Sequence, residues 1–75
     1  MADRSLDASG LRCPMPLLKT KLEFNSMSPG EQLEVLATDA GSNRDIPAYV
    51  AMSPHRLVSQ SESNGVYRFM IECGG

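Results

Sequence analysis

The sequence lacks an excess of positive charge and lacks any long hydrophobic run. Seven Lys and Arg stand against nine Asp and Glu, giving a formal net charge of −2. Because basic residues dominate affinity for phosphate backbones, this balance argues against nucleic acid as the main ligand. The apolar stretches fall far short of the ~20 residues of a membrane helix, and the first residues lack the apolar core of a secretory signal. We therefore expect a cytoplasmic protein without a membrane partner.

The chain is also short. Its 75 residues predict one domain over residues 1–75. A domain of this size buries only about 60% of the surface of its unfolded chain, so its core is thin. A deep substrate cavity is not expected, and any chemistry should take place at the surface.

Residues that bind metals or act as bases are scarce, since there are only two cysteines and one histidine. Cys13, Cys73 and His55 do not have the spacing of a common metal site, and no metal or cofactor is expected. A Cys-x-x-Cys redox pair is absent because Pro16 stands where the second cysteine of such a pair would be. His55 follows a predicted helix and is expected to be a turn or surface residue rather than a base beside a thiol. Free thiols are favoured over a disulfide, and Cys73 is expected to end a strand as a bystander.

Glycine and proline divide the chain into six segments. Alternating apolar residues predict strands over residues 4–8, 32–38 and 66–72, and Asn64-Gly65 predicts a tight turn that joins the last one to a strand near 56–62. Helical spacing predicts one helix between residues 13 and 27 and another over about 42–52, with Ser42 and Asp45 as an N-terminal capping pair. The order βαβαββ predicts an α/β two-layer sandwich, with both helices on one face of a four-stranded mixed sheet.

Periodicity also predicts which faces are buried. One set of apolar residues shares a face within each strand, and another set forms a stripe along the first helix. These core candidates are Leu33, Val35, Ala37, Tyr67, Phe69, Ile71, Leu17, Thr20, Phe24 and Met27, together with Tyr49, Val50 and Met52 of the second predicted helix.

The segment most suited to chemistry is Cys13-Pro14-Met15-Pro16, at the expected start of the first helix. Proline is favoured there because its fixed φ suits a helix and its missing N–H costs nothing in the first turn. Pro14 and Pro16 should therefore hold Cys13 at the helix N-cap. The alternative is a cysteine that only fills apolar space.

The surroundings of Cys13 predict an acidic thiol. The positive end of the helix dipole and free amides of the first turn favour a thiolate. Arg12 adds a neighbouring positive charge, and Lys19 lies about one turn along. We therefore expect the pKa of Cys13 to fall and its sulfur to be a surface nucleophile.

Three apolar residues of the first helix, Met15, Leu18 and Leu22, lie opposite the predicted core stripe. One hypothesis is an exposed apolar patch beside Cys13, fringed by Lys19, where partner proteins dock. The alternative is that the second helix covers these residues.

The motif resembles that of the TusA family of small sulfur carriers, also called SirA-like, whose mark is Cys-Pro-x-Pro after the first strand. The resemblance runs nearly end to end. It is carried by Gly10-Leu11-Arg12-Cys13-Pro14-Met15-Pro16, Leu6-Asp7, Pro29-Gly30-Glu31, Leu33-Glu34-Val35, Asp39 and Arg44-Asp45-Ile46-Pro47. It implies a fold like the C-terminal domain of translation initiation factor 3.

The resemblance also implies a persulfide on Cys13 and two kinds of protein partner. The sulfur donor would be a cysteine desulfurase or a rhodanese-like protein, and the acceptor a DsrE-like protein of a sulfur relay, such as the one for 2-thiouridine in tRNA. Other family members serve molybdenum-cofactor synthesis or dissimilatory sulfur oxidation. A protein-binding regulatory module without sulfur transfer, or a redox-sensing thiol, would also fit the sequence.

The end of the chain departs from this pattern at Cys73, which precedes Gly74-Gly75. Ubiquitin-like sulfur carriers bear a thiocarboxylate on such a tail, but they begin with a hairpin, whereas here the predicted hairpin comes last. We therefore expect Gly74-Gly75 to be a flexible tail without chemistry.

Overall fold

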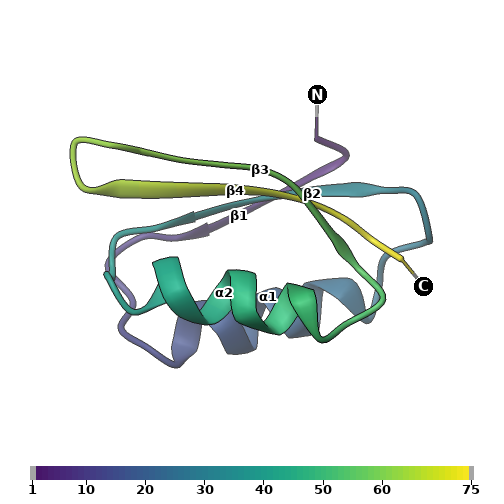
Figure 1. Ribbon diagram of the computed structural model, residues 1–75, viewed down its shortest axis with the longest axis horizontal. Coiled ribbons are helices and arrows are strands. Elements are labelled where there is room, and N and C mark those ends of the chain that lie inside the picture. Colours follow the sequence, from purple (N-terminus) through teal and green to yellow (C-terminus); the bar gives the residue numbers. More distant parts are fainter. Residues whose placement is uncertain (1, 75) are drawn as a thin grey trace.

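The computed structural model describes residues 2–74 and has the predicted order βαβαββ (Figure 1). Each element lies within a few residues of its predicted bounds. The elements are β1 (Arg4–Ala8), α1 (Met15–Phe24), β2 (Gln32–Ala37), α2 (Ser42–Ala51), β3 (Arg56–Ser63) and β4 (Val66–Glu72).

The four strands form one mixed sheet in the order β1-β2-β4-β3. β1 pairs with β2 in parallel, whereas β4 pairs with β2 and β3 antiparallel. Asn64 and Gly65 both have positive φ, 52° and 81°, as the predicted tight turn between β3 and β4 requires. Both helices lie on one face of the sheet and leave the other face open, so the predicted sandwich is confirmed (Figure 1).

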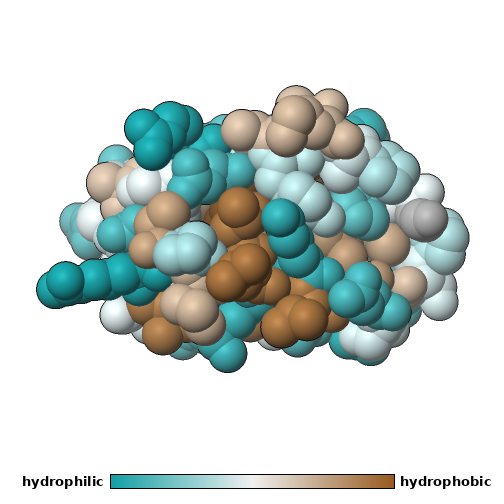
Figure 2. Space-filling view, turned by 90° about the horizontal axis from the view of Figure 1, so that it is seen from below, coloured by the Kyte–Doolittle hydropathy of each residue, from teal (hydrophilic) through white to brown (hydrophobic). Residues whose placement is uncertain are grey.

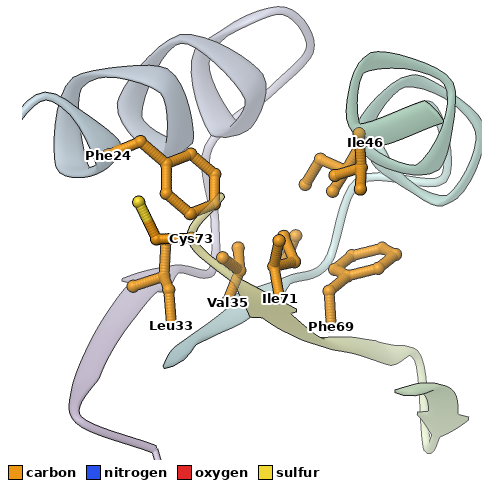
Figure 3. Close-up of a cluster of buried hydrophobic side chains, with 9 residues drawn as sticks. Phe24, Leu33, Val35, Ile46, Phe69, Ile71 and Cys73 are labelled. Atoms are coloured by element: carbon orange, nitrogen blue, oxygen red, sulfur yellow. The ribbon is translucent and has the colours of Figure 1, made fainter. Parts of the chain in front are cut away.

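The core lies between the sheet and the helices, and the predicted faces form it (Figure 3). Alternate residues of β2 and β4 point toward the helices, because strand side chains alternate between the two faces, and all of these except Tyr67 are fully buried. The buried core residues are Phe24, Leu33, Val35, Ala37, Ile46, Val50, Phe69, Ile71 and Cys73. Leu17, Met27, Tyr49 and Tyr67 are partly buried against them, and Thr20 is buried on the same stripe of α1. The predicted packing of Met52 is wrong, because this residue lies just after α2 and is 86% exposed.

The predicted capping pair of α2 is wrong. Gly41 is the N-cap, no side chain caps the helix, and Ser42 Oγ is buried with no hydrogen-bond partner among residues 2–74. Asp45 instead accepts a hydrogen bond from outside the helix, from Cys13. A Ser and an Asp three residues apart are typical of a helix start, but a tertiary partner takes the carboxylate here.

His55 is more than the predicted turn or surface residue. It is half-buried, and its ring stacks on Phe24 with centroids 3.9 Å apart. Its Nδ1 accepts a hydrogen bond from the backbone N–H of Gly74 at 2.9 Å. Gly74 is therefore held at this edge of the core, and Gly75, the rest of the predicted tail, lies outside the described residues. Cys73 directly follows β4 and is only 2% exposed.

Candidate functional site

The sheet topology brings the two helix starts together. β1 and β2 are parallel, so their carboxyl ends lie at the same edge of the sheet, and each strand is followed by a loop and a helix. Cys13 lies in the loop before α1, and Asp45 lies in the first turns of α2. Residues far apart in sequence therefore meet where such folds commonly place their functional groups.

Cys13 is an exposed, free cysteine. Its thiol donates a hydrogen bond to Asp45 Oδ2, with sulfur and oxygen 2.6 Å apart. Pro14 follows it through a cis peptide bond and is the N-cap of α1. Cys13 therefore lies one position before the N-cap, and its predicted place at the N-cap is wrong by one residue. Pro16 is buried, which anchors the motif to the helix layer.

Gly41 provides the space for this contact. A Cβ at position 41 would lie 3.3 Å from Cys13 Cβ, 3.6 Å from Cys13 Sγ and 2.8 Å from Asp39 Oδ2. Asp39 Oδ2 accepts the backbone N–H of Gly41 at 3.0 Å. The absence of a side chain at Gly41 thus allows Cys13 to approach the start of α2.

The pKa of Cys13 is raised above its ordinary value, and the main cause is the hydrogen bond from its thiol to Asp45. Desolvation and the negative charges of Asp45 and Asp39 act in the same direction, whereas Arg44 opposes them. The pKa of Asp45 is lowered, chiefly because it accepts this hydrogen bond in its charged form. Cys13 is therefore held as a thiol beside a carboxylate.

The expectation of an acidic Cys13 is therefore wrong. The amide of Met15 donates to the carbonyl of Arg12 at 2.8 Å, so it is not free to stabilise a thiolate. The carboxylate of Asp45, delivered by α2, lies against the sulfur. A full negative charge in direct contact outweighs the partial charge of a helix start.

The other predicted supporting residues surround the motif. Arg12 and Lys19 are exposed, and the cation that lowers the Cys13 pKa is Arg44 rather than either of them. Arg44 is itself highly exposed and pairs with Asp45 Oδ1 at 3.5 Å. Sequence reasoning missed Arg44, Asp45 and Gly41 as members of the site. The signal for the first two was the segment Arg44-Asp45-Ile46-Pro47, which the resemblance had already singled out.

The apolar residues of α1 opposite the core are open to solvent rather than covered by α2. Met15 and Leu18 are each 42% exposed and Leu22 is 67% exposed, and we name these three residues the α1 patch. Figure 2 shows apolar side chains gathered on the helix layer, with hydrophilic ones around them. Of the two alternatives that the sequence left open, the structure shows the exposed surface.

Two hollows in the part of the chain that the structure describes, residues 2–74, are both lined by residues other than Cys13. A hollow of about 480 Å³ lies near the C-terminal end of α1, lined by Phe24, Tyr49, His55 and Cys73 among others, and Cys13 is not part of it. Among residues 2–74, no group of three or more His, Cys, Asp or Glu is placed to hold a metal ion, and no helix is long and apolar enough to cross a membrane.

Comparison with known proteins agrees with this picture. A family model described as sulfurtransferase TusA matches residues 4–73. The sulfur carrier protein TusA of Allochromatium vinosum is 43% identical over 70 residues, which cover 93% of this chain and 92% of that protein. YrkI of Bacillus subtilis is 40% identical over 73 residues, 97% of each chain. A SirA-like protein of Desulfitobacterium hafniense superimposes with a TM-score of 0.81 at 22% identity, covering 96% of this chain and 99% of its own.

Proposed function

Because this chain belongs to the TusA sulfurtransferase family, we propose that it carries sulfur as a persulfide on Cys13, taking it from one protein and passing it to another. The observation that supports this role most directly is the exposed, free thiol of Cys13 at the edge of the domain, which does not line the hollow beside Phe24 and Cys73. A carrier needs a sulfur that two different proteins can reach in turn. An enclosed site would hinder both exchanges.

Loading is a thiol exchange that needs no external oxidant. The sulfur of Cys13 attacks the outer sulfur of a cysteine persulfide on the donor, and the S–S bond of the donor breaks. The electron pair of that bond leaves on the donor cysteine, which takes up the proton lost by Cys13. The outer sulfur keeps its oxidation state and is now bonded to Cys13.

Delivery repeats the exchange in the other direction. A thiolate on the acceptor attacks the outer sulfur on Cys13, and Cys13 leaves as a thiolate that takes up a proton. Pro14 and Pro16 keep the reacting cysteine at the start of α1, and Arg12 is the nearest exposed cation along the chain. In this proposal Arg12 meets the approaching partner rather than the resting thiol.

The α1 patch, with Lys19 beside it, is the proposed docking surface. Partly exposed Met15 and Leu18 follow Cys13 directly on α1, and Leu22 extends the apolar surface by one turn. An apolar surface with a basic fringe suits a protein partner, since fully desolvated apolar residues provide most of the binding energy of interfaces. A partner seated on it would have its own reactive sulfur close to Cys13.

The family resemblance supports a cysteine desulfurase or a rhodanese-like protein as donor and a DsrE-like protein as acceptor, in the cytoplasm. We place the chain in the relay for tRNA 2-thiouridine, with dissimilatory sulfur oxidation and molybdenum-cofactor synthesis as the alternatives. The net charge of −2 is consistent with protein partners rather than direct tRNA binding.

Mass spectrometry of the intact protein tests the proposal. The reduced protein is incubated with a cysteine desulfurase, its pyridoxal cofactor and cysteine, and in parallel with a persulfidated rhodanese. We expect wild type to gain one sulfur atom, Cys73→Ala to gain it equally, and Cys13→Ser to gain none.

Loading of Cys13→Ser, or failure of wild type with both donors, would contradict the proposal. In the second case, partner binding that survives in Cys13→Ser would instead support a regulatory module without sulfur transfer.

A further inference from the structure

The contact between Cys13 and Asp45 has a specific direction. A carboxylate only accepts hydrogen bonds, so the proton of the pair belongs to the sulfur. Cys13 Sγ and Asp45 Oδ2 are 2.6 Å apart, and Asp45 is held on helix α2 while Cys13 is held before α1. The thiol proton is therefore the link that ties the sulfur to the second helix.

We propose that Asp45 is a positioning residue that holds Cys13 as a protonated thiol in the empty carrier and no longer holds it once the cysteine has taken up sulfur. This inference rests on the proposed sulfur-carrier function. It assigns α2 a part in the chemistry, in addition to α1 with its Cys-Pro-x-Pro motif.

The charges around Cys13 favour this state. Asp45 and Asp39 lie on the α2 side, and both raise the pKa of the thiol. Arg44 acts in the opposite direction, but it is highly exposed and already pairs with Asp45. Arg12, in the loop before α1, is exposed to solvent. A Cys13 thiolate would be repelled by the negative charge of Asp45 at this distance, whereas a Cys13 thiol donates a hydrogen bond to the carboxylate.

Loading removes the link. In a persulfide Cys13 Sγ is bonded to Cβ and to the outer sulfur and carries no hydrogen, so it cannot donate to Asp45. The lone pairs of Sγ would then face the carboxylate at the distance of the former hydrogen bond, which is repulsive. The loaded sulfur therefore turns away from Asp45 toward solvent and the acceptor protein.

The pH dependence of Cys13 alkylation by iodoacetamide tests whether Asp45 keeps the Cys13 thiol protonated, and it needs no sulfur donor. Peptide mass spectrometry separates Cys13 from Cys73. We expect the wild-type midpoint to lie above the ordinary pKa of a cysteine thiol. In Asp45→Asn it should fall by about one pH unit, which gives roughly tenfold more thiolate at neutral pH.

Asp39→Asn is the matched control, because it also removes one carboxylate near the sulfur but leaves the hydrogen bond to Asp45 in place. It should shift the midpoint less than Asp45→Asn does. Equal shifts in the two variants, or an unchanged midpoint in Asp45→Asn, would overturn the proposal.

An NMR titration of Asp45 makes the test independent of how well Asp45→Asn folds. In Cys13→Ala the carboxylate has lost its donor, so its pKa should rise from the lowered wild-type value. The same rise is expected in persulfidated wild type. If the pKa of Asp45 is the same in wild type, Cys13→Ala and persulfidated wild type, the proposal that Asp45 holds the Cys13 thiol is contradicted. If only the loading of Cys13 fails, the result counts against the carrier function, and the alkylation result still tests the role of Asp45.

Discussion

Gly41 lies beside Cys13 across the two helix starts, so close that a side chain at position 41 would crowd the cysteine. A Cβ on Gly41 would stand 3.3 Å from Cys13 Cβ and 2.8 Å from Asp39 Oδ2. The backbone of Gly41 has φ −62°, an ordinary helical value. Space rather than backbone conformation therefore favours glycine here, and the space in question is the one beside Cys13.

Gly41→Ala should impair loading more than it impairs folding. The backbone angles suit alanine, so the free energy of unfolding should change by less than about 1 kcal/mol. The added methyl group pushes Cys13 or Asp39 aside, and a small misplacement of a reacting group can cost up to ~100-fold in rate. We expect the initial rate of persulfide loading to fall about tenfold or more, with urea unfolding as the control measurement. A loading rate equal to that of wild type would show that the space at Gly41 beside Cys13 does not matter for persulfide loading.

A charge introduced into the α1 patch should weaken binding of the sulfur donor, whereas a charge at an equally exposed apolar residue elsewhere should not. Leu18 on α1 is 42% exposed and Val58 on β3 is 41% exposed, so Val58→Glu is a matched control for Leu18→Glu. Leu18→Glu should raise the Kd for the sulfur donor about tenfold, or ~1.4 kcal/mol, because the charge must be desolvated at an apolar interface. Calorimetry measures both variants. Equal Kd values for the two would remove the patch as the docking surface.

The pair Cys13 and Asp45 should stabilise the fold only in a defined pH window. The pKa of Asp45 is lowered from its ordinary 3.8, so its contribution is present above that value and is lost as pH falls through the lowered pKa. The pKa of Cys13 is raised from 9.0, so its contribution is present below that value and is lost as pH rises through the raised pKa.

A double-mutant cycle of Cys13→Ala and Asp45→Ala, measured by urea unfolding at several pH values, checks this. The coupling energy should be constant near neutral pH and should vanish at both extremes. A coupling energy that is absent at neutral pH, or that persists in strong acid, is incompatible with a hydrogen bond between thiol and carboxylate.

Cys73 should matter for stability and not for sulfur transfer. Its thiol is 2% exposed and belongs to the core cluster, where its sulfur points toward Phe24 of α1 (Figure 3). Cys73→Ser places a more polar hydroxyl there, which should cost about 1–3 kcal/mol if it stays unpaired. Thermal unfolding should show a Tm lower by about 4 °C or more. The persulfide loading of Cys13 should stay at the wild-type level at a temperature where both proteins are folded. Reduced loading there would favour a redox link between the two cysteines.

The fold was predictable because its signals are local. Leu33, Val35 and Ala37 alternate along β2, and all three are fully buried. Asn64-Gly65 specifies a hairpin through its backbone angles alone. Such patterns can be recognised without knowing what packs against them. The predicted bounds of the strands and helices therefore lie within a few residues of the bounds in the structure.

The site was only half predictable, for the same reason. Cys13 was visible because a cysteine before Pro14 and Pro16 is a local pattern. Its partner Asp45 lies 32 residues away, and the contact depends on the parallel pairing of β1 with β2. Local reasoning assigned Asp45 to a helix cap and assigned the wrong sign to the Cys13 pKa. The stacking of His55 on Phe24 was missed likewise, since neither residue specifies the other in sequence.

The distance along the chain between Cys13 and Asp45 also sets an order of events in folding. β1 and the loop with Cys13 are synthesised first, and the carboxylate follows only after α1, β2 and the start of α2. Closing this long loop requires β1 to find β2, which is slower than forming either helix. A newly made or partly unfolded chain thus presents Cys13 with ordinary cysteine acidity. The rise in its pKa is a late step, so the acidity of this one thiol can serve as a probe of when the domain has finished folding.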